Sequence, residues 1–216
     1  MGLGKIGILE MSKDSNNLYL NMLSNHCNFN TTNFSFYPTY FDEINNLLPH
    51  PSKELKKLLV NYLDKIKDVN YLIVPNITIH QTLDELFKEQ TFKFKLIHPI
   101  IELVHDLKKV DQNKVVIFGS KHTMQPGYIS SLLENYGIKC SFPTTKDYQQ
   151  IETYRIAVYN KTATPDTINN FNTIVKKHAT KTNVILACTE LSLAYNSNFS
   201  NVFDLVKIQV ASCFSK

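Results

Sequence analysis

Four short apolar runs, separated by stretches with helical periodicity, constrain the fold of this chain more than any other feature of its sequence. The runs are KIGILE (5–10), YLIVP (71–75), KVVIFG (114–119) and NVILAC (183–188), and each ends in small or polar residues. Runs of this length are typical of buried strands in parallel sheets. Because strands that alternate with helices form βαβ units, the sequence predicts an α/β fold with parallel sheets flanked by helices.

The segments between these runs supply the helices. Residues 51–68 place apolar side chains on one face, with Pro51 and Ser52 at the start. Residues 126–137 end in Gly137, and glycine is a common helix stop. We expect further helices over 164–179 and 201–214, and minor strands over 34–37, 93–97 and 139–142.

The pattern occurs twice, with a division near residue 98. Each half has an opening strand, a helix, a second strand, a long helix, and then a strong apolar strand that ends in a polar cluster. We therefore expect a first subdomain over 1–97 and a second over 98–201, with a final helix over 202–214 that packs back on the first.

The two polar clusters, at 76–80 and 188–190, are the candidate site. Ligands of open α/β sheets bind beyond the carboxyl ends of the strands. We therefore expect the halves to be related by a pseudo-twofold axis, with the site between them.

The composition is that of a globular protein, and we expect the protein to be cytoplasmic and to lack a membrane segment. Hydrophobic residues make up 43% of the chain, yet no apolar run approaches the ~20 residues of a membrane span. The N-terminus has no signal-peptide pattern. Arg155 is the only arginine among the 23 basic residues, whereas nucleic-acid sites favour arginine. We interpret the lysines as solvated surface, with no nucleic-acid partner.

The four cysteines, Cys27, Cys140, Cys188 and Cys213, contain no CxxC pair, and nothing in the sequence suggests export. They are expected to be free thiols in a reducing compartment. His98 and His105 are seven residues apart, a spacing that puts them on one helical face. Since they lack a third ligand, we interpret them as packing residues and expect no metal site.

Three segments resemble motifs of the aspartate/glutamate racemase family. Residues 75–80 read PNITIH, where the family has Pro-Cys-Asn-Thr-Ala-His, and residues 187–191 read ACTEL, where it has Gly-Cys-Thr-Glu-Leu. Residues 119–123, GSKHT, resemble a Gly-Thr-x-x-Thr turn. The match follows the family in order over nearly the whole chain. It implies a two-subdomain fold, a reaction without cofactors and a homodimer.

The chain departs from the family at several positions. The first family cysteine falls on Asn76, or on Pro75 after a one-residue slip, so no thiol stands there. The Gly-Gly-Met-Gly-Pro turn after the first strand is replaced by EMSKD at 10–14. The arginine usually found after the second strand has no counterpart before Arg155, and Lys161 stands near the place of a family lysine.

The resemblance implies proton transfer at an α-carbon. Racemisation without a cofactor needs a base on each face of that carbon, and Cys188 can serve one face. A helix start after the strand would favour its thiolate. Hydroxyls that can hold a carboxylate come from Thr78, Ser120, Thr123 and Thr189.

The other residues of the motifs have more limited or alternative roles. Asn76 cannot act as a base and can only orient a carboxylate or a water molecule. His80 is either a proton donor or a cap of the helix that follows. Glu190 either tunes Cys188 or forms a surface pair, and His122 belongs either to a binding turn or to a plain loop.

Three functions are compatible with these residues. The first is a racemase or isomerase that acts on a small amino acid or carboxylate with Cys188. The second is a cofactor-free lyase similar to arylmalonate decarboxylase, which needs only the second-half cysteine. The third is a small-carboxylate-binding protein that has lost the chemistry.

Overall fold

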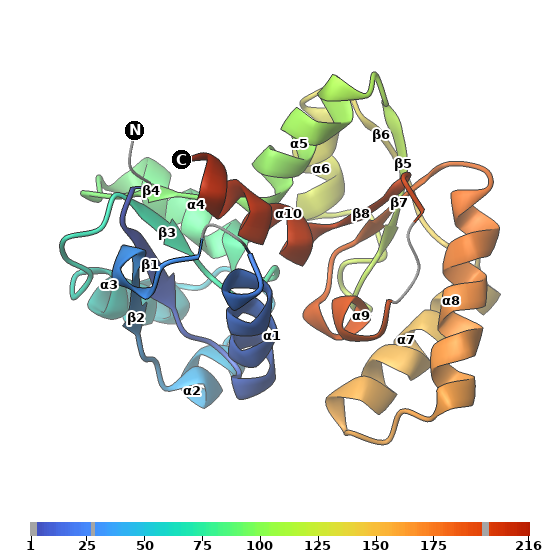
Figure 1. The fold of residues 1–216 in the computed structure, drawn as a ribbon, viewed down its shortest axis with the longest axis horizontal. Coiled ribbons are helices and arrows are strands. Elements are labelled where there is room, and N and C mark those ends of the chain that lie inside the picture. The colour runs from blue at the N-terminus through green and yellow to red at the C-terminus, as the bar shows by residue number, and fades with distance from the viewer. Residues whose placement is uncertain (1–3, 27–28, 196–198) are drawn as a thin grey trace. The chain divides into compact units, whose positions relative to one another are not determined.

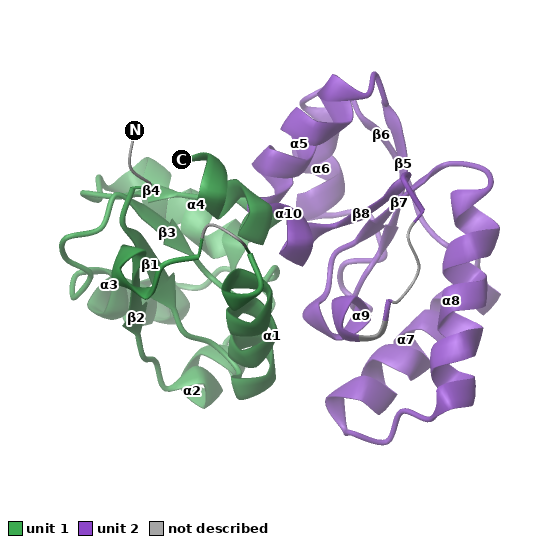
Figure 2. Cartoon of the chain, viewed as in Figure 1, with its two compact units in different colours: residues 1–98, 209–216 green, residues 99–208 purple. Residues whose placement is uncertain are grey.

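The computed structural model describes residues 4–26, 29–195 and 199–216 and has an α/β architecture built on parallel strands (Figure 1). The chain divides into two compact units. The first comprises Met1–His98 and Gln209–Lys216, and the second comprises Pro99–Ile208 (Figure 2).

The first unit contains a four-stranded sheet in the order β2-β1-β3-β4, with every pair parallel. Its strands are β1 (Ile6–Leu9), β2 (Phe34–Tyr37), β3 (Tyr71–Ile73) and β4 (Lys95–Leu96). Its helices are α1 (Lys13–Ser24), α2 (Phe41–Asn45), α3 (Lys53–Leu63) and α4 (His80–Glu89), with a 3₁₀ turn at Thr31–Asn33.

The second unit repeats this topology with the strand order β6-β5-β7-β8, again all parallel. Its strands are β5 (Lys114–Phe118), β6 (Lys139–Ser141), β7 (Asn183–Leu186) and β8 (Val202–Asp204). Its helices are α5 (Pro99–Lys109), α6 (Tyr128–Glu134), α7 (Thr145–Tyr159), α8 (Pro165–Ala179), α9 (Thr189–Ala194) and the start of α10 (Leu205–Ser212). The predicted fold class, two similar parallel α/β halves, is confirmed.

Local signals set several helix boundaries as predicted. The Ser52 side chain accepts the Leu55 N–H at the start of α3, and Thr164 caps α8 in the same way. After α6, Gly137 takes a positive φ of 79°, a conformation that glycine adopts without steric cost.

The helix predicted from residue 201 or 202 is wrong over its first residues. Val202–Asp204 form strand β8, in which Phe203 pairs with Ile185 of β7. The helix starts only at Leu205, because Asp204 Oδ1 accepts the backbone N–H groups of Val206 and Lys207 and so ends the strand. Of this last helix and its 3₁₀ extension Cys213–Ser215, only the part from Gln209 groups with the first unit.

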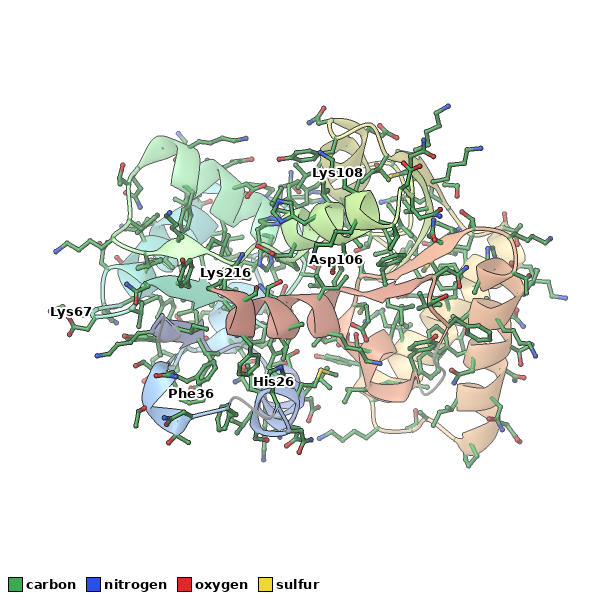
Figure 3. All side chains as sticks on the ribbon, turned by 45° about the horizontal axis from the view of Figure 1, so that its top comes forward. His26, Phe36, Lys67, Asp106, Lys108 and Lys216 are labelled. Atoms are coloured by element: carbon green, nitrogen blue, oxygen red, sulfur yellow. The ribbon has the colours of Figure 1, made fainter. Side chains whose placement is uncertain are left out.

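The C-terminal segment is held in the first unit by buried contacts. The Gln209 side chain accepts a hydrogen bond from the Tyr19 hydroxyl and donates one to the Ile97 carbonyl, both at 2.6 Å. Phe214 stacks on His26 at the end of α1, with 3.6 Å between ring centroids. His26 is labelled in Figure 3, where Lys67 extends outward at the left edge of the view.

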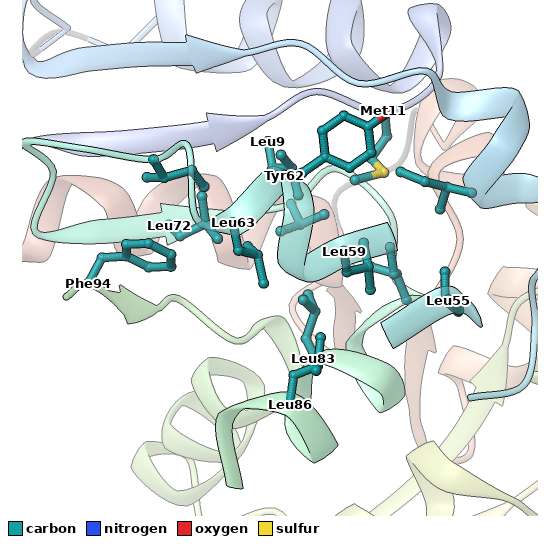
Figure 4. Packing of buried hydrophobic residues seen from close by; sticks show 14 of the residues in the cluster. Leu9, Met11, Leu55, Leu59, Tyr62, Leu63, Leu72, Leu83, Leu86 and Phe94 are labelled. Carbon is teal, nitrogen blue, oxygen red and sulfur yellow. The ribbon is translucent and has the colours of Figure 1, made fainter. Parts of the chain in front are cut away.

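Each unit has its own apolar core. In the first, leucines of α3 and α4 interdigitate beneath the sheet, and Figure 4 shows Leu59 and Leu63 above Leu83 and Leu86. In the second, β5 and β7 are covered by buried side chains of α7 and α8, and Cys188 belongs to this cluster. No helix within the described ranges has the length and apolar character to cross a bilayer.

Candidate functional site

Cys188 lies between the carboxyl end of β7 and the first residue of α9. The residue is only 9% exposed, and its Sγ donates a hydrogen bond to Glu190 Oε2 at 2.8 Å. The Thr189 hydroxyl donates to the same carboxylate oxygen at 3.1 Å. The structure therefore pairs the predicted thiol with the predicted acidic neighbour.

The environment of Cys188 disfavours its thiolate in the unliganded protein. Burial, and then the Glu190 carboxylate, raise the pKa of the Cys188 thiol well above its ordinary value, while the charge of Arg155 acts in the opposite direction. This differs from the thiolate expected at a helix start. The main reason is that the thiol is buried, and the second is that the Glu190 carboxylate faces the sulfur directly.

The turn after β5 packs against the strand end that leads to Cys188. A Cβ on Gly119 would lie 2.8 Å from Thr123 Cγ2 and 3.2 Å from the Ala187 carbonyl oxygen, so only glycine fits there. Ser120 Oγ and Thr123 Oγ1 are 3.0 Å apart and hydrogen-bonded. Five predicted residues therefore form two hydrogen-bonded groups, which follow the neighbouring strands β5 and β7: Ser120 with Thr123, and Cys188 and Thr189 with Glu190.

Helix α7 contributes charged residues that the sequence analysis did not place in the site. Arg155 donates through Nε and Nη2 to the two carboxylate oxygens of Glu152, each bond at 2.8 Å. Glu152 Oε2 also accepts the backbone N–H of Lys121 at 3.1 Å, which ties α7 to the turn after β5. Both side chains are largely buried, at 21% and 17% exposure. The available signal was that Arg155 is the only arginine of the chain.

Asp204, at the end of β8, is connected to the Cys188 backbone through the side chain of Ser192. The Ser192 hydroxyl lies 2.8 Å from Asp204 Oδ1 and 3.2 Å from the Cys188 carbonyl oxygen. Burial raises the pKa of the Asp204 carboxyl, and its Oδ2 has no hydrogen-bond partner among the described residues. The Asp204 carboxyl is therefore linked to the Cys188 backbone only indirectly, through the Ser192 hydroxyl.

In the first unit, Asn76 follows β3 and organises the start of α4. Its Oδ1 accepts the Ile79 N–H at 3.2 Å, and its backbone carbonyl accepts the His80 Nδ1–H at 2.8 Å. The amide of Asn76 is therefore engaged in a local turn. Thr78 lies half-buried within the same turn.

His80 is a poor proton donor in this environment. Its side chain is fully buried, and the Nε2 atom has no hydrogen-bond partner among the described residues. Burial, and then the neighbouring His98, lower the pKa of His80 to about 3. The His98 ring lies edge-on at 4.9 Å, and its Nε2 is 3.4 Å from Asp84 Oδ1.

The remaining sequence candidates are His122, Lys161, the pair His98 and His105, and the other cysteines. His122 is half-buried in the turn after β5, and Lys161 is exposed after α7, with a φ of 59°. His98 precedes α5, so the predicted helical face shared with His105 is wrong. Cys140, Cys188 and Cys213 are free thiols, and Cys27 lies outside the described residues. Within the described ranges, no three His, Cys, Asp or Glu residues form a metal-binding group.

The hydroxyl of Tyr154 gives a first prediction. It is buried without a hydrogen-bond partner among the described residues, while its ring stacks on Phe171 at 4.3 Å. We expect Tyr154→Phe to keep or raise stability by up to about 1 kcal/mol, because an unsatisfied buried hydroxyl is costly. Tyr19→Phe is the matched control. It should lose about 1 kcal/mol, since the Tyr19 hydroxyl donates to Gln209. Urea unfolding of both variants checks this, and an equal loss in both would contradict it.

No protein-family model and no curated protein matches the sequence. Solved structures, in contrast, match the fold over nearly the whole chain. A provisionally assigned Asp/Glu racemase from Yersinia pestis matches with a TM-score of 0.82 at 20% identity, over 99% of this chain and 98% of that one. An aspartate racemase homologue from Pyrococcus horikoshii gives a TM-score of 0.83 at 19% identity, with the same coverage of 99% and 98%.

The aspartate racemase of Picrophilus torridus matches with a TM-score of 0.74 at 18% identity, over 98% of this chain and 94% of that one. The likeness therefore extends over both units and over nearly the full length of each compared protein. The resemblance seen in the sequence motifs is confirmed at the level of the fold: this chain has the fold of the aspartate/glutamate racemase structures.

Proposed function

We propose that this protein is a racemase-like enzyme that works without a cofactor and exchanges the α-proton of a small amino acid or carboxylate at Cys188. The observation that carries the proposal is the hydrogen bond from Cys188 Sγ to Glu190 Oε2, at 2.8 Å, in a motif of the racemase type on a racemase fold. By the same analogy, we propose a homodimer in the cytoplasm, with a small carboxylate as the ligand.

The Cys188–Glu190 pair can carry out one half of the reaction. Transfer of the Sγ proton to the Glu190 carboxylate leaves a thiolate. The thiolate then takes the α-proton as the C–H bond breaks, and the electron pair moves into the substrate carboxylate as an enediolate. The hydroxyls of Ser120, Thr123 and Thr189 are the donors that we propose for that negative charge. The reverse step returns a proton to the same face.

The chemistry of the other face separates two candidate functions. Asn76 has no titratable proton, and His80 is neutral with a pKa of about 3, so neither is a ready second base. The raised pKa of Cys188 means that the resting thiol is protonated, which favours a donor role. A lyase that loses CO₂ and then protonates its enediolate on one face therefore remains the second candidate.

Deuterium exchange tests the proposal. In D₂O, one enantiomer of aspartate or glutamate should exchange its α-proton much faster than the other, with little net racemisation, because Cys188 reaches one face only. Proton NMR measures the exchange, and chiral chromatography measures the racemisation. Cys188→Ala should lower the exchange by about 100-fold to 10,000-fold.

Each alternative predicts a different result. Release of CO₂ from substituted malonates without α-proton exchange would support the lyase. Saturable binding of small carboxylates without either reaction would support a binding protein. Comparable racemisation of both enantiomers by the natural chain would show that another residue supplies the second base, with His122 the first to be substituted.

A further inference from the structure

Helix α7 packs against α9, the helix that begins directly after Cys188. Ile151 and Tyr154 of α7 lie in the same buried cluster as Cys188. Arg155 follows Tyr154 directly in the sequence, and its side chain is 21% exposed. The helix therefore carries a cation to the edge of the core that contains the thiol.

The guanidinium of Arg155 is fixed in place before any ligand binds. Glu152 holds it through two parallel hydrogen bonds, a bidentate geometry that is stronger and more directional than a single ion pair. Glu152 is itself anchored to the turn after β5 through the Lys121 N–H. Only two of the five N–H donors of Arg155 are used in these bonds.

The negative charge of the Cys188–Glu190 pair does not depend on where its shared proton resides. With the proton on sulfur, the charge lies on the carboxylate, and with the proton on oxygen, it lies on the thiolate. Arg155 interacts favourably with both groups, and its charge opposes the rise in the pKa of Cys188. Lysine would offer a point charge without the bidentate anchor.

We propose that Arg155, held by Glu152, is a positioning residue that balances the charge of the Cys188–Glu190 pair and so keeps the thiolate of Cys188 within reach. The groups that act on the charge of Cys188 are then Glu190 from α9 and, from α7, the Tyr154 hydroxyl and Arg155 together with the Glu152 carboxylate bound to it. Asp204 acts from β8 only through Ser192. This inference builds on the proposed role of Cys188, although its test requires no turnover.

The test measures the rate at which iodoacetamide alkylates Cys188 as a function of pH, with mass spectrometry resolving each cysteine. Because only the thiolate reacts, the midpoint of the profile reports the pKa of the thiol. The parent protein is the natural chain, in which the Cys188–Glu190 pair is intact, and its labelling is followed into the alkaline range because burial and Glu190 raise the pKa of the thiol. Adding Arg155→Gln should move the midpoint up by about one pH unit, which is roughly tenfold slower labelling below it.

Two further variants make the result specific. Arg155→Lys keeps the charge and should label within about threefold of the parent. Lys177→Gln removes a charge of the same sign from α8, where Lys177 binds Asp147, and should leave the profile unchanged. If the profile of Arg155→Gln coincides with that of Lys177→Gln, the proposal is wrong.

Unfolding of a variant and failure of the proposed function give results that differ from failure of this proposal. Unfolding of the Arg155→Gln variant would raise the labelling of Cys140 and Cys213 together with Cys188, and Arg155→Met, which keeps the apolar stem, then decides. An unchanged profile in that variant also overturns the proposal. Absence of α-proton exchange, together with a shifted labelling profile, would refute the proposed racemase function and leave the role of Arg155 intact.

Discussion

Asn76→Cys is expected to convert one-sided proton exchange into net racemisation. The substitution places a thiol where the alignment without a slip puts the cysteine of the Pro-Cys-Asn-Thr-Ala-His motif, and a correctly placed acid–base group contributes about 100-fold to 10,000-fold in rate. Chiral chromatography of aspartate or glutamate after incubation measures the gain, with the natural chain as the baseline.

The substitution also removes a structural contact, which needs its own control. Asn76 Oδ1 accepts the Ile79 N–H before α4, and loss of such a cap costs about 0.5–2 kcal/mol. Asn76→Ala loses the same contact without adding a thiol, so the comparison of the two variants isolates the chemistry. Equal racemisation rates in Asn76→Cys and Asn76→Ala would show that a thiol at position 76 is not sufficient to supply the second base.

The fold could be predicted because local signals and hydrophobic pattern agree. Each of the four apolar runs contains a strand, and the caps at Ser52 and Thr164 mark helix starts. The strand Val202–Asp204 was missed because three residues are too few to show a period. Its identity comes from pairing with β7, which is a tertiary contact.

The candidate site could be predicted from the sequence only where its residues are close together along the chain. Cys188 and Glu190 are two residues apart, so their pairing was open to sequence reasoning as one of two alternatives. Arg155 and Glu152 were not found, because their relation to the turn after β5 depends on how α7 packs. The neutral state of His80 is equally a property of burial, which no local pattern reveals.

The buried pair of histidines should make the first unit sensitive to acid. Burial is the main cause that lowers the pKa of His80 to about 3 and that of His98 to about 4, whereas both groups have a pKa of about 6.5 when unfolded. Between these values the unfolded chain binds more protons than the folded one, so stability falls as the pH drops below about 6.5. Each histidine lowers the free energy of unfolding by about 1.4 kcal/mol for each pH unit below 6.5.

From pH 6.5 to pH 4.5, the two groups together should therefore lower the free energy of unfolding by up to about 5 kcal/mol. This loss is comparable to the whole stability of many domains. Urea unfolding followed by circular dichroism measures it, and hydrogen exchange of the α4 amides assigns it to the first unit.

Asp147 does not contribute in this range. The bonds from Lys177, His178 and Thr144 outweigh its burial and hold its pKa at about 2, so its stabilising effect is lost only below about 3.8.

Substitutions that keep the hydrogen bonds but remove the titration provide the decisive comparison. His80→Asn retains a donor for the Asn76 carbonyl, and His98→Gln retains one toward Asp84. Combined, they should flatten the pH dependence between 6.5 and 4.5, even if the variant is less stable at neutral pH. His105→Gln is the matched control, because it removes a histidine whose side chain is 56% exposed. A double variant that keeps the full acid slope would mean that other groups cause it, since a histidine that is absent cannot take up a proton on unfolding.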